Sequence, residues 1–149
     1  MADLCVTTVI EAPPSVVWED ISRIATHVEW MHDAVAIRFT GDQRLGVGVA
    51  FDCDTKVGPL RLTDRMQITE WAEAEVMGVR HSGAVTGEGR FTLEAIGAAR
   101  TRFTWRETLR FPWWLGGPIG AFLGGSVLRL VWRRNLANLA TRFEVQSRT

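Results

Sequence analysis

Apolar and polar residues alternate along most of the chain between residues 34 and 111. A period of two is typical of a β-strand with one buried face and one exposed face. The alternation predicts strands at residues 34–39, 49–57, 60–68, 75–82, 89–96 and 102–111. Residues 4–10, which are rich in Val, Thr and Ile, predict one more strand near the beginning of the chain. Seven strands are therefore expected.

Helices are predicted before and after this region of alternation. Pro13 and Pro14 suit the first turn of a helix, and a short helical piece is expected at residues 25–31. A long helix is expected from Pro118 to Glu144, because apolar residues recur there at spacings of three and four: Leu128, Trp132, Leu136, Leu139 and Phe143. Arg129, Arg133 and Arg142 fall on other faces of this helix and are expected to remain in water.

The first half of the long helix has several residues with little or no side chain: Gly117, Gly120, Ala121, Gly124 and Gly125. A glycine within a helix costs about 1 kcal/mol relative to alanine, so a cluster of them calls for a physical reason. One reason is close packing of the helix against a sheet. Another is that the helix lines a cavity, which the missing side chains keep empty.

This order of elements predicts an α+β fold. Consecutive strands joined by short turns form an antiparallel sheet, and its apolar face must be covered. The C-terminal helix is the element long enough to cover it, so a curved seven-stranded sheet is expected to wrap round that helix, with two short helices after the first strand. At 149 residues the chain is expected to form a single domain, residues 1–149.

Composition excludes some classes of function. The 17 basic and 17 acidic residues give a net charge of zero, which argues against a general nucleic-acid binder. Cys5 and Cys53 lack the spacing of a metal site, and both are expected to be buried, reduced thiols. No basic leader precedes the first strand, so a cytoplasmic location is expected.

Residues 111–128 carry no charge, which brings this stretch close to the length of a membrane-spanning helix. Two prolines and five glycines interrupt it, so a lip that contacts membranes or apolar ligands is the better interpretation. Trp113, Trp114 and Leu115 lie at its beginning and are predicted to form a lid over a ligand. A dimer contact, or burial against the first helices, would explain the same residues.

Four features of the sequence resemble the START-domain-like (SRPBCC) superfamily, often described as polyketide cyclase/dehydrase and lipid transport. They are the Ala-Pro-Pro-x-x-Val-Trp segment ending at Trp18, then Trp30, the Gly-x-Gly-x-Phe segment ending at Phe91, and the Thr-Arg-Phe-Thr segment at 101–104. The resemblance covers essentially the whole chain. It implies a helix-grip fold with a deep cavity between the sheet and the C-terminal helix. In the superfamily that cavity holds lipids, sterols, polyketides or plant hormones, and some members catalyse cyclisation or aromatisation.

Residues expected to contact such a ligand lie on the inner faces of the strands and on the long helix. They are Trp30, Phe51, Met66, Phe91, Phe103, Trp105, Ala121, Gly124, Gly125, Leu128 and Trp132. Large aromatic rings suit a cavity wall, although each of these rings also suits an ordinary hydrophobic core.

Three polar residues fall on strand faces that otherwise point to the interior: Asp64, His81 and Glu107. A buried carboxyl group or a histidine can serve as a general acid or base in an enolisation, aldol closure or dehydration. These three are therefore the candidate catalytic residues. The alternative is that Asp64 and Glu107 pair with arginines at the rim of the sheet, or that a bulge shifts the assigned faces.

Signatures of other chemistries are missing from the sequence. The three histidines lack metal-ligand spacing, so no metal site is expected. The Gly87-Glu88-Gly89 and Gly46-Val47-Gly48 segments lack the context of a nucleotide-binding loop and are interpreted as turns. No cofactor is expected. Tyrosine is absent, which excludes a mechanism that needs a phenol in the cavity.

Three functions remain open. The first is binding of a hydrophobic small molecule, such as a lipid, an isoprenoid or a polyketide. The second is a polyketide cyclase or dehydratase that uses Glu107, Asp64 or His81 as acid or base. The third is a protein- or membrane-interaction module that uses the Trp113–Trp114 lip. The expected partner is a hydrophobic small molecule rather than nucleic acid, with peripheral membrane contact as a further expectation and either a monomer or a homodimer as the assembly.

Overall fold

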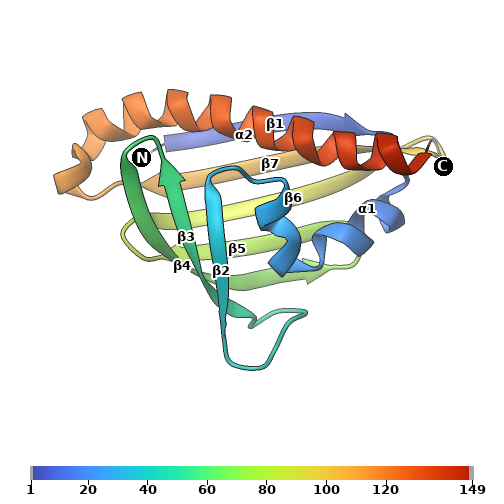
Figure 1. Ribbon diagram of the computed structural model, residues 1–149, viewed down its shortest axis with the longest axis horizontal. Helices are drawn as coiled ribbons and strands as arrows, with labels where there is room; N and C mark the ends of the chain where they lie inside the picture. Colours follow the sequence, from blue (N-terminus) through green and yellow to red (C-terminus); the bar gives the residue numbers. More distant parts are fainter. Residues whose placement is uncertain (1, 148–149) are drawn as a thin grey trace.

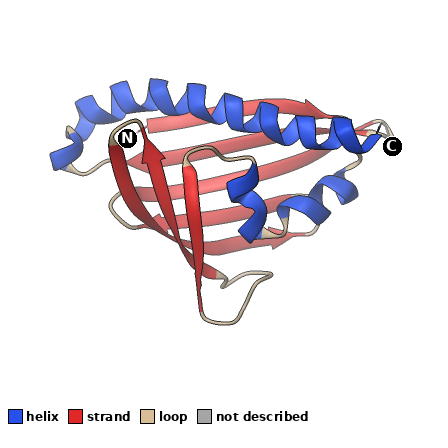
Figure 2. Cartoon of the chain, in the orientation of Figure 1, coloured by secondary structure: helices blue, strands red, loops and turns tan. Residues whose placement is uncertain are grey.

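The computed structural model describes residues 2–147, without the side chains of 115, 117–123 and 145–147. Within this part of the chain, seven strands form one antiparallel sheet in the order β1-β7-β6-β5-β4-β3-β2 (Figures 1 and 2). The strands are β1 (Ala2–Ile10), β2 (Ala34–Thr40), β3 (Ala50–Val57), β4 (Leu60–Ala72), β5 (Val76–Ser82), β6 (Thr86–Ile96) and β7 (Arg100–Arg110). The predicted α+β fold with a seven-stranded antiparallel sheet is confirmed.

Turns and one longer loop join β2 to β7 in succession, so each of these strands pairs with the next. β1 instead pairs with β7, because α1 (Pro14–Ile21) and the 3₁₀ helix η1 (Ile24–Glu29) carry the chain from one edge of the sheet to the other. Figure 1 shows the resulting curvature, with β2 and β3 crossing in front of the remaining strands. The sheet thus has a concave face that a helix can fill.

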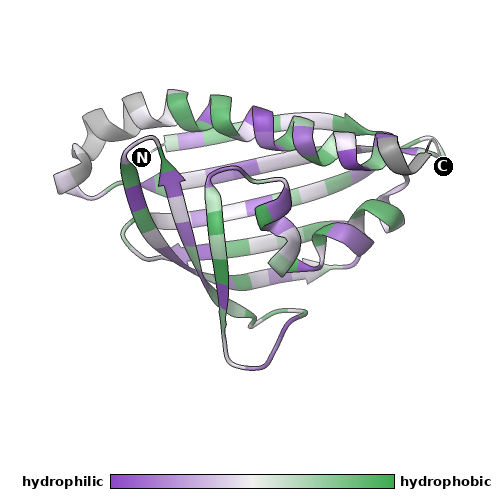
Figure 3. Ribbon diagram, viewed as in Figure 1, coloured by the Kyte–Doolittle hydropathy of each residue, from purple (hydrophilic) through white to green (hydrophobic). Residues whose placement is uncertain are grey.

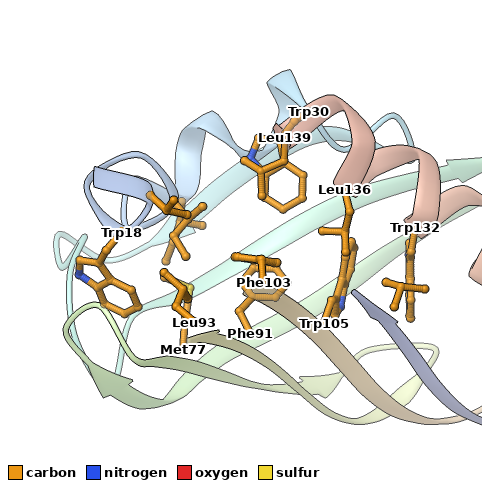
Figure 4. Close-up of a cluster of buried hydrophobic side chains, with 14 of the residues drawn as sticks. Trp18, Trp30, Met77, Phe91, Leu93, Phe103, Trp105, Trp132, Leu136 and Leu139 are labelled. Carbon is orange, nitrogen blue, oxygen red and sulfur yellow. The ribbon is translucent and has the colours of Figure 1, made fainter. Parts of the chain in front are cut away.

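The long helix α2 (Gly117–Ser147) runs along β1, on the β1–β7 side of this concave face (Figure 1). The predicted apolar stripe is confirmed in its second half, where Trp132, Leu136, Leu139 and Phe143 are buried. Figure 4 shows Trp132 and Leu136 beside Trp105 of β7. The rings of Trp105 and Trp132 stack with their centroids 4.5 Å apart and an angle of 16° between their planes. The helix therefore rests on β1 and on the aromatic side chain of Trp105 from the neighbouring strand β7.

Polar contacts tie α2 to the short helices after β1. Arg142 forms an ion pair with Asp20 of α1, at 2.9 Å, and a longer one with Glu29 of η1, at 3.4 Å. Asn135 is fully buried, and its side-chain amide donates a hydrogen bond to Asp33 at 2.7 Å. Arg142, which was expected to remain in water, keeps 29% of its side chain exposed and is otherwise covered, because the acidic residues of α1 and η1 lie against this face of α2.

Two further expectations need correction. Cys5 is exposed, because alternation along β1 turns its side chain to the outer face of the sheet, whereas Cys53 is buried as expected. Gly87 and Gly89 lie within β6 and not in a turn, because this strand begins at Thr86. Figure 3 shows polar and apolar residues alternating along the strands, which is why neighbouring positions have such different surroundings.

Candidate ligand-binding cavity and its polar cluster

A cavity of about 310 Å³ lies between the concave face of the sheet and α2. Strands β3 to β7 form most of its wall, and most of the lining side chains are aliphatic or aromatic. Gly124, Val127, Leu128 and Trp132 line it from α2. Leu60 and Val127 are exposed, so the cavity opens to solvent at the end of the sheet where β3 turns into β4.

Both explanations for the glycine-rich half of α2 apply, but to different residues. Gly124 lines the cavity, and among the described residues a Cβ atom added to it would meet the Phe111 ring alone, at 3.8 Å. Gly125 faces β1, where an added Cβ would lie 3.6 Å from Ala2 and 3.7 Å from Leu4. Gly124 thus leaves room for a ligand, and Gly125 allows close packing on the sheet. Ala121 lies outside the described side chains.

The structure brings seven of the residues expected to contact a ligand to the cavity wall: Phe51, Met66, Phe91, Trp105, Gly124, Leu128 and Trp132. Trp30, Phe103 and Gly125 do not line it. Trp30 and Phe103 are fully buried in the core beside Phe91 (Figure 4). Their rings support the wall from behind, so any effect of these two on a ligand would be indirect.

Asp64, His81 and Glu107 meet in the cavity wall and form what we call the carboxylate–histidine cluster. His81 Nδ1 lies 2.5 Å from Asp64 Oδ2, and His81 Nε2 lies 2.7 Å from Glu107 Oε2. The Trp105 indole N–H donates a hydrogen bond to Glu107 Oε1 at 3.0 Å. His81 and Glu107 are buried, and Asp64 is nearly so. The alternative in which the carboxylates pair with arginines at the rim is wrong, because they pair with His81.

A glycine of β6, Gly89, explains how the cluster forms. His81 lies on β5 and Glu107 on β7, roughly 10 Å apart across the intervening strand. Gly89 stands directly opposite Glu107, and a Cβ atom added to it would lie 2.4 to 2.7 Å from the carboxylate. Gly87 stands opposite His81, but a Cβ atom added to it would overlap the Thr108 carbonyl oxygen, so the close approach of the β7 backbone requires this glycine. Because Gly89 has no side chain, the imidazole and the Glu107 carboxylate can meet above β6.

His81 is held in its protonated form. Burial opposes the charge, but the Glu107 carboxylate and the hydrogen bonds to Asp64 and Glu107 outweigh it and raise the pKa of His81 to about 10. A neutral imidazole has one N–H donor, whereas the imidazolium has two and can serve both carboxylates. The two hydrogen bonds of His81 to carboxylates and its raised pKa therefore both indicate a protonated imidazole. Asp64 Oδ1 is buried and receives no hydrogen bond from any described residue.

A second histidine in the cavity wall, His27, is neutral. Burial lowers its pKa to about 4, despite the opposing hydrogen bond with the Ile21 carbonyl. Its Nε2–H donates that bond at 2.7 Å. Sequence reasoning gave His27 no role, because the position of η1 over the sheet is a tertiary feature. The described residues contain no group of His, Cys, Asp and Glu side chains that could hold a metal ion.

The Trp113–Trp114 lip lies at the open end of the cavity in the 3₁₀ helix η2 (Trp113–Leu115), between β7 and α2. Trp113 is 87% exposed and Trp114 is 53% exposed, and neither side chain lines the cavity. The side chain of Leu115 lies outside the described part. The lid therefore stays a prediction. None of the helices, over the residues described, is both long and apolar enough to cross a membrane.

A curved antiparallel sheet that encloses an apolar cavity with a long C-terminal helix defines the START-like class of ligand-binding folds. The sequence profile described as "Polyketide cyclase / dehydrase and lipid transport" matches residues 1–144, and the chain belongs to this family. No curated protein matches the chain.

Solved structures share this fold at low sequence identity. A START superfamily protein from Mycobacterium smegmatis has a TM-score of 0.81 and 11% identity, over 98% of this chain and 99% of its own. The protein TTHA0849 from Thermus thermophilus has a TM-score of 0.80 and 15% identity, over 97% and 99%. The Zhui aromatase/cyclase from Streptomyces sp. R1128 has a TM-score of 0.73 and 17% identity, over 95% and 93%.

Proposed function

We propose that this protein binds a hydrophobic small molecule, such as a lipid, an isoprenoid or a polyketide-like compound, in the cavity between the sheet and α2. The observation that carries this proposal is the cavity itself, which is lined mainly by aliphatic and aromatic side chains. Its volume of about 310 Å³ falls at the lower end of the range for small-molecule sites. The family description, which includes lipid transport, is consistent with this function.

Native mass spectrometry of gently purified protein, followed by extraction of any bound compound, tests the proposal. A stoichiometric apolar ligand is expected. Gly124→Leu should fill the cavity and abolish uptake while the fold survives, because this glycine lines the cavity and an added Cβ would make only an ordinary contact with the Phe111 ring, at 3.8 Å, among the described residues. Ala137→Leu adds the same side chain to the exposed face of α2 and should bind as the wild type does. Equal ligand uptake by Gly124→Leu and the wild type would contradict the proposal.

A second candidate function is acid–base catalysis on a polyketide-like substrate, as in a cyclase or dehydratase. The carboxylate–histidine cluster favours it, because it places a protonated imidazole and two carboxylates in the wall of an otherwise apolar cavity. Such a site could protonate a carbonyl or hydroxyl oxygen and remove a proton from an adjacent carbon. Two structural neighbours are an aromatase/cyclase and a di-domain aromatase/cyclase from the steffimycin pathway, with 17% and 13% identity.

Turnover of a polyketide-like substrate separates the two functions. Under the catalytic alternative, Glu107→Gln should abolish turnover while the protein stays folded and still binds the substrate. Glu88→Gln changes an exposed residue on the opposite face of β6 and should keep wild-type turnover. Unchanged turnover in Glu107→Gln would remove Glu107 from the mechanism and leave binding as the function.

A further inference from the structure

In the described part of the cavity wall, no lysine or arginine points its charged group into the cavity. Arg90 is the one such residue with atoms in that wall. It lies between Gly89 and Phe91, whose side of β6 faces the interior, so the Arg90 side chain points to the outer face of the sheet. There its guanidinium binds the Glu70 carboxylate, with nitrogen–oxygen distances of 2.6 and 3.1 Å. A ligand therefore meets no free basic side chain from the sheet.

The histidine donors of the wall are also in use. His27 donates its Nε2–H to the Ile21 carbonyl, and His81 donates both of its N–H groups to carboxylates. The Trp105 indole N–H is bound to Glu107. What remains for a ligand are uncharged groups, such as the Thr55 hydroxyl, whose nearest partner is a cysteine sulfur at 3.9 Å. The described wall thus has no charged donor to spare.

Hydrogen-bond acceptors, in contrast, outnumber donors in the carboxylate–histidine cluster. The cluster contains two carboxyl groups and one imidazolium, so its charge is negative when both carboxyl groups are ionised. Asp64 Oδ1 receives no hydrogen bond from the described residues. The Asp64 side chain lines the cavity and is 18% exposed, which makes it the member of the cluster that a ligand reaches most easily. An ionised carboxylate with an unsatisfied oxygen is costly in an apolar site. Because Oδ1 itself is covered, a ligand donor would bind the exposed side of the carboxylate or reach Oδ1 after a small rotation of the Asp64 side chain.

We infer that the ligand is an apolar molecule with a hydrogen-bond donor at one end, a hydroxyl or an ammonium group, which binds at Asp64 beside His81 and Glu107. Apolar molecules with a carboxylate or phosphate head are rejected, because the described wall provides neither a free cation nor a free charged donor for them. This inference rests on the proposed binding function and narrows it to a chemical class of ligand.

Three ligands with the same chain and different heads test the inference: octanol, octylamine and octanoic acid. Their binding to wild-type protein at neutral pH is followed by quenching of tryptophan fluorescence and by native mass spectrometry. Octanol or octylamine should bind at least about tenfold more tightly than octanoic acid, because an anion beside the cluster is repelled in a low-dielectric site. Octanoic acid binding as tightly as both others would overturn the inference and leave the binding function standing. Binding of none of the three would count against the binding function itself.

Asp64→Asn provides the second arm of the test. The amide keeps the shape of the side chain, removes its charge and adds an N–H donor. The ratio of the Kd for octanoic acid to the Kd for octanol should therefore fall by about fivefold or more. Asp52→Asn is the matched control, because Asp52 lies on the same hairpin and pairs with Arg65 at the outer face. If Asp64→Asn fails to fold, Glu107→Gln takes its place. An unchanged preference in a folded cluster variant would overturn the assignment of the cluster as the binding site for the head group.

Discussion

His81 is the residue on which the polar part of the site depends. Its imidazolium joins two carboxylates on different strands: Asp64 on β4, which is next to β5, and Glu107 on β7, which is two strands away. An isolated carboxylate in this apolar wall would be strongly disfavoured, and the positive charge between the two lowers that cost. The cluster can therefore remain charged inside an apolar cavity.

The raised pKa of His81 predicts an alkaline loss of stability. In the unfolded chain its pKa is close to 6.5, and in the folded protein it is about 10. A pKa that folding raises contributes stability fully below pH 6.5, and this contribution disappears as the pH rises through about 10. Urea unfolding between pH 6 and pH 10 should show a decrease on the order of a few kcal/mol.

His81→Gln should flatten that dependence of the unfolding free energy on pH, because the titrating group is gone. NMR titration of the imidazole would report its pKa directly. A His81 resonance that titrates near pH 6.5 in the folded protein would contradict the charged cluster.

Gly89→Ala tests how the cluster is positioned. The new methyl group would overlap the Glu107 carboxylate, which is the mobile end of a side chain and can move away. We expect the fold to survive with a loss of roughly 1–3 kcal/mol in the free energy of unfolding, because Glu107 loses its bond to His81. The pKa of His81 should fall, as measured by NMR. Glu88→Ala, on the exposed face of the same strand, should change neither quantity.

Among the elements, α2 shows most clearly what periodicity can predict. Its buried stripe follows from spacings of three and four, since residues so spaced share one face of a helix. The period of two that predicts strands was less accurate for β2, where Val35 is exposed although Ile37 and Phe39, at the same alternation, pack against the core. The register of β2 and β3 shifts between Ala34 and Ala36, and this irregularity separates Val35 from the other two.

Leu136 and Leu130 form a matched pair on α2. Leu136 is buried under the sheet, whereas Leu130 faces solvent. Leu136→Ala should lower the free energy of unfolding by about 2–5 kcal/mol, because it leaves a cavity in the core. Leu130→Ala should change it by less than about 0.5 kcal/mol. Equal losses in chemical denaturation would show that the assigned orientation of α2 is wrong.

At the scale of the whole molecule, the open end of the cavity and the Trp113–Trp114 lip lie at the same end of the sheet. β7 ends at Arg110, close to the turns that join β3 to β4 and β5 to β6. An exposed pair of tryptophans beside an apolar opening fits contact with a membrane surface, a protein partner or the entering ligand. Which of these the lip contacts stays a prediction.

Trp113→Ala separates a contact role from a structural one. Because Trp113 is 87% exposed, its removal should change the free energy of unfolding by less than about 0.5 kcal/mol. If the lip contacts membranes, sedimentation with lipid vesicles should decrease in the same variant. A large loss of stability would instead show that Trp113 is packed in the folded protein.

The sequence alone determined the number of strands, the long C-terminal helix and its buried face, and it placed Asp64, His81 and Glu107 on inward faces. These properties depend on local periodicity, which neighbouring residues in the chain encode. It could not show that the three side chains meet, that Gly124 faces the cavity while Gly125 faces β1, or that Trp30 and Phe103 lie behind the wall. Those outcomes depend on strand register and on the position of α2 over the sheet, which only the packing of residues far apart in the chain decides.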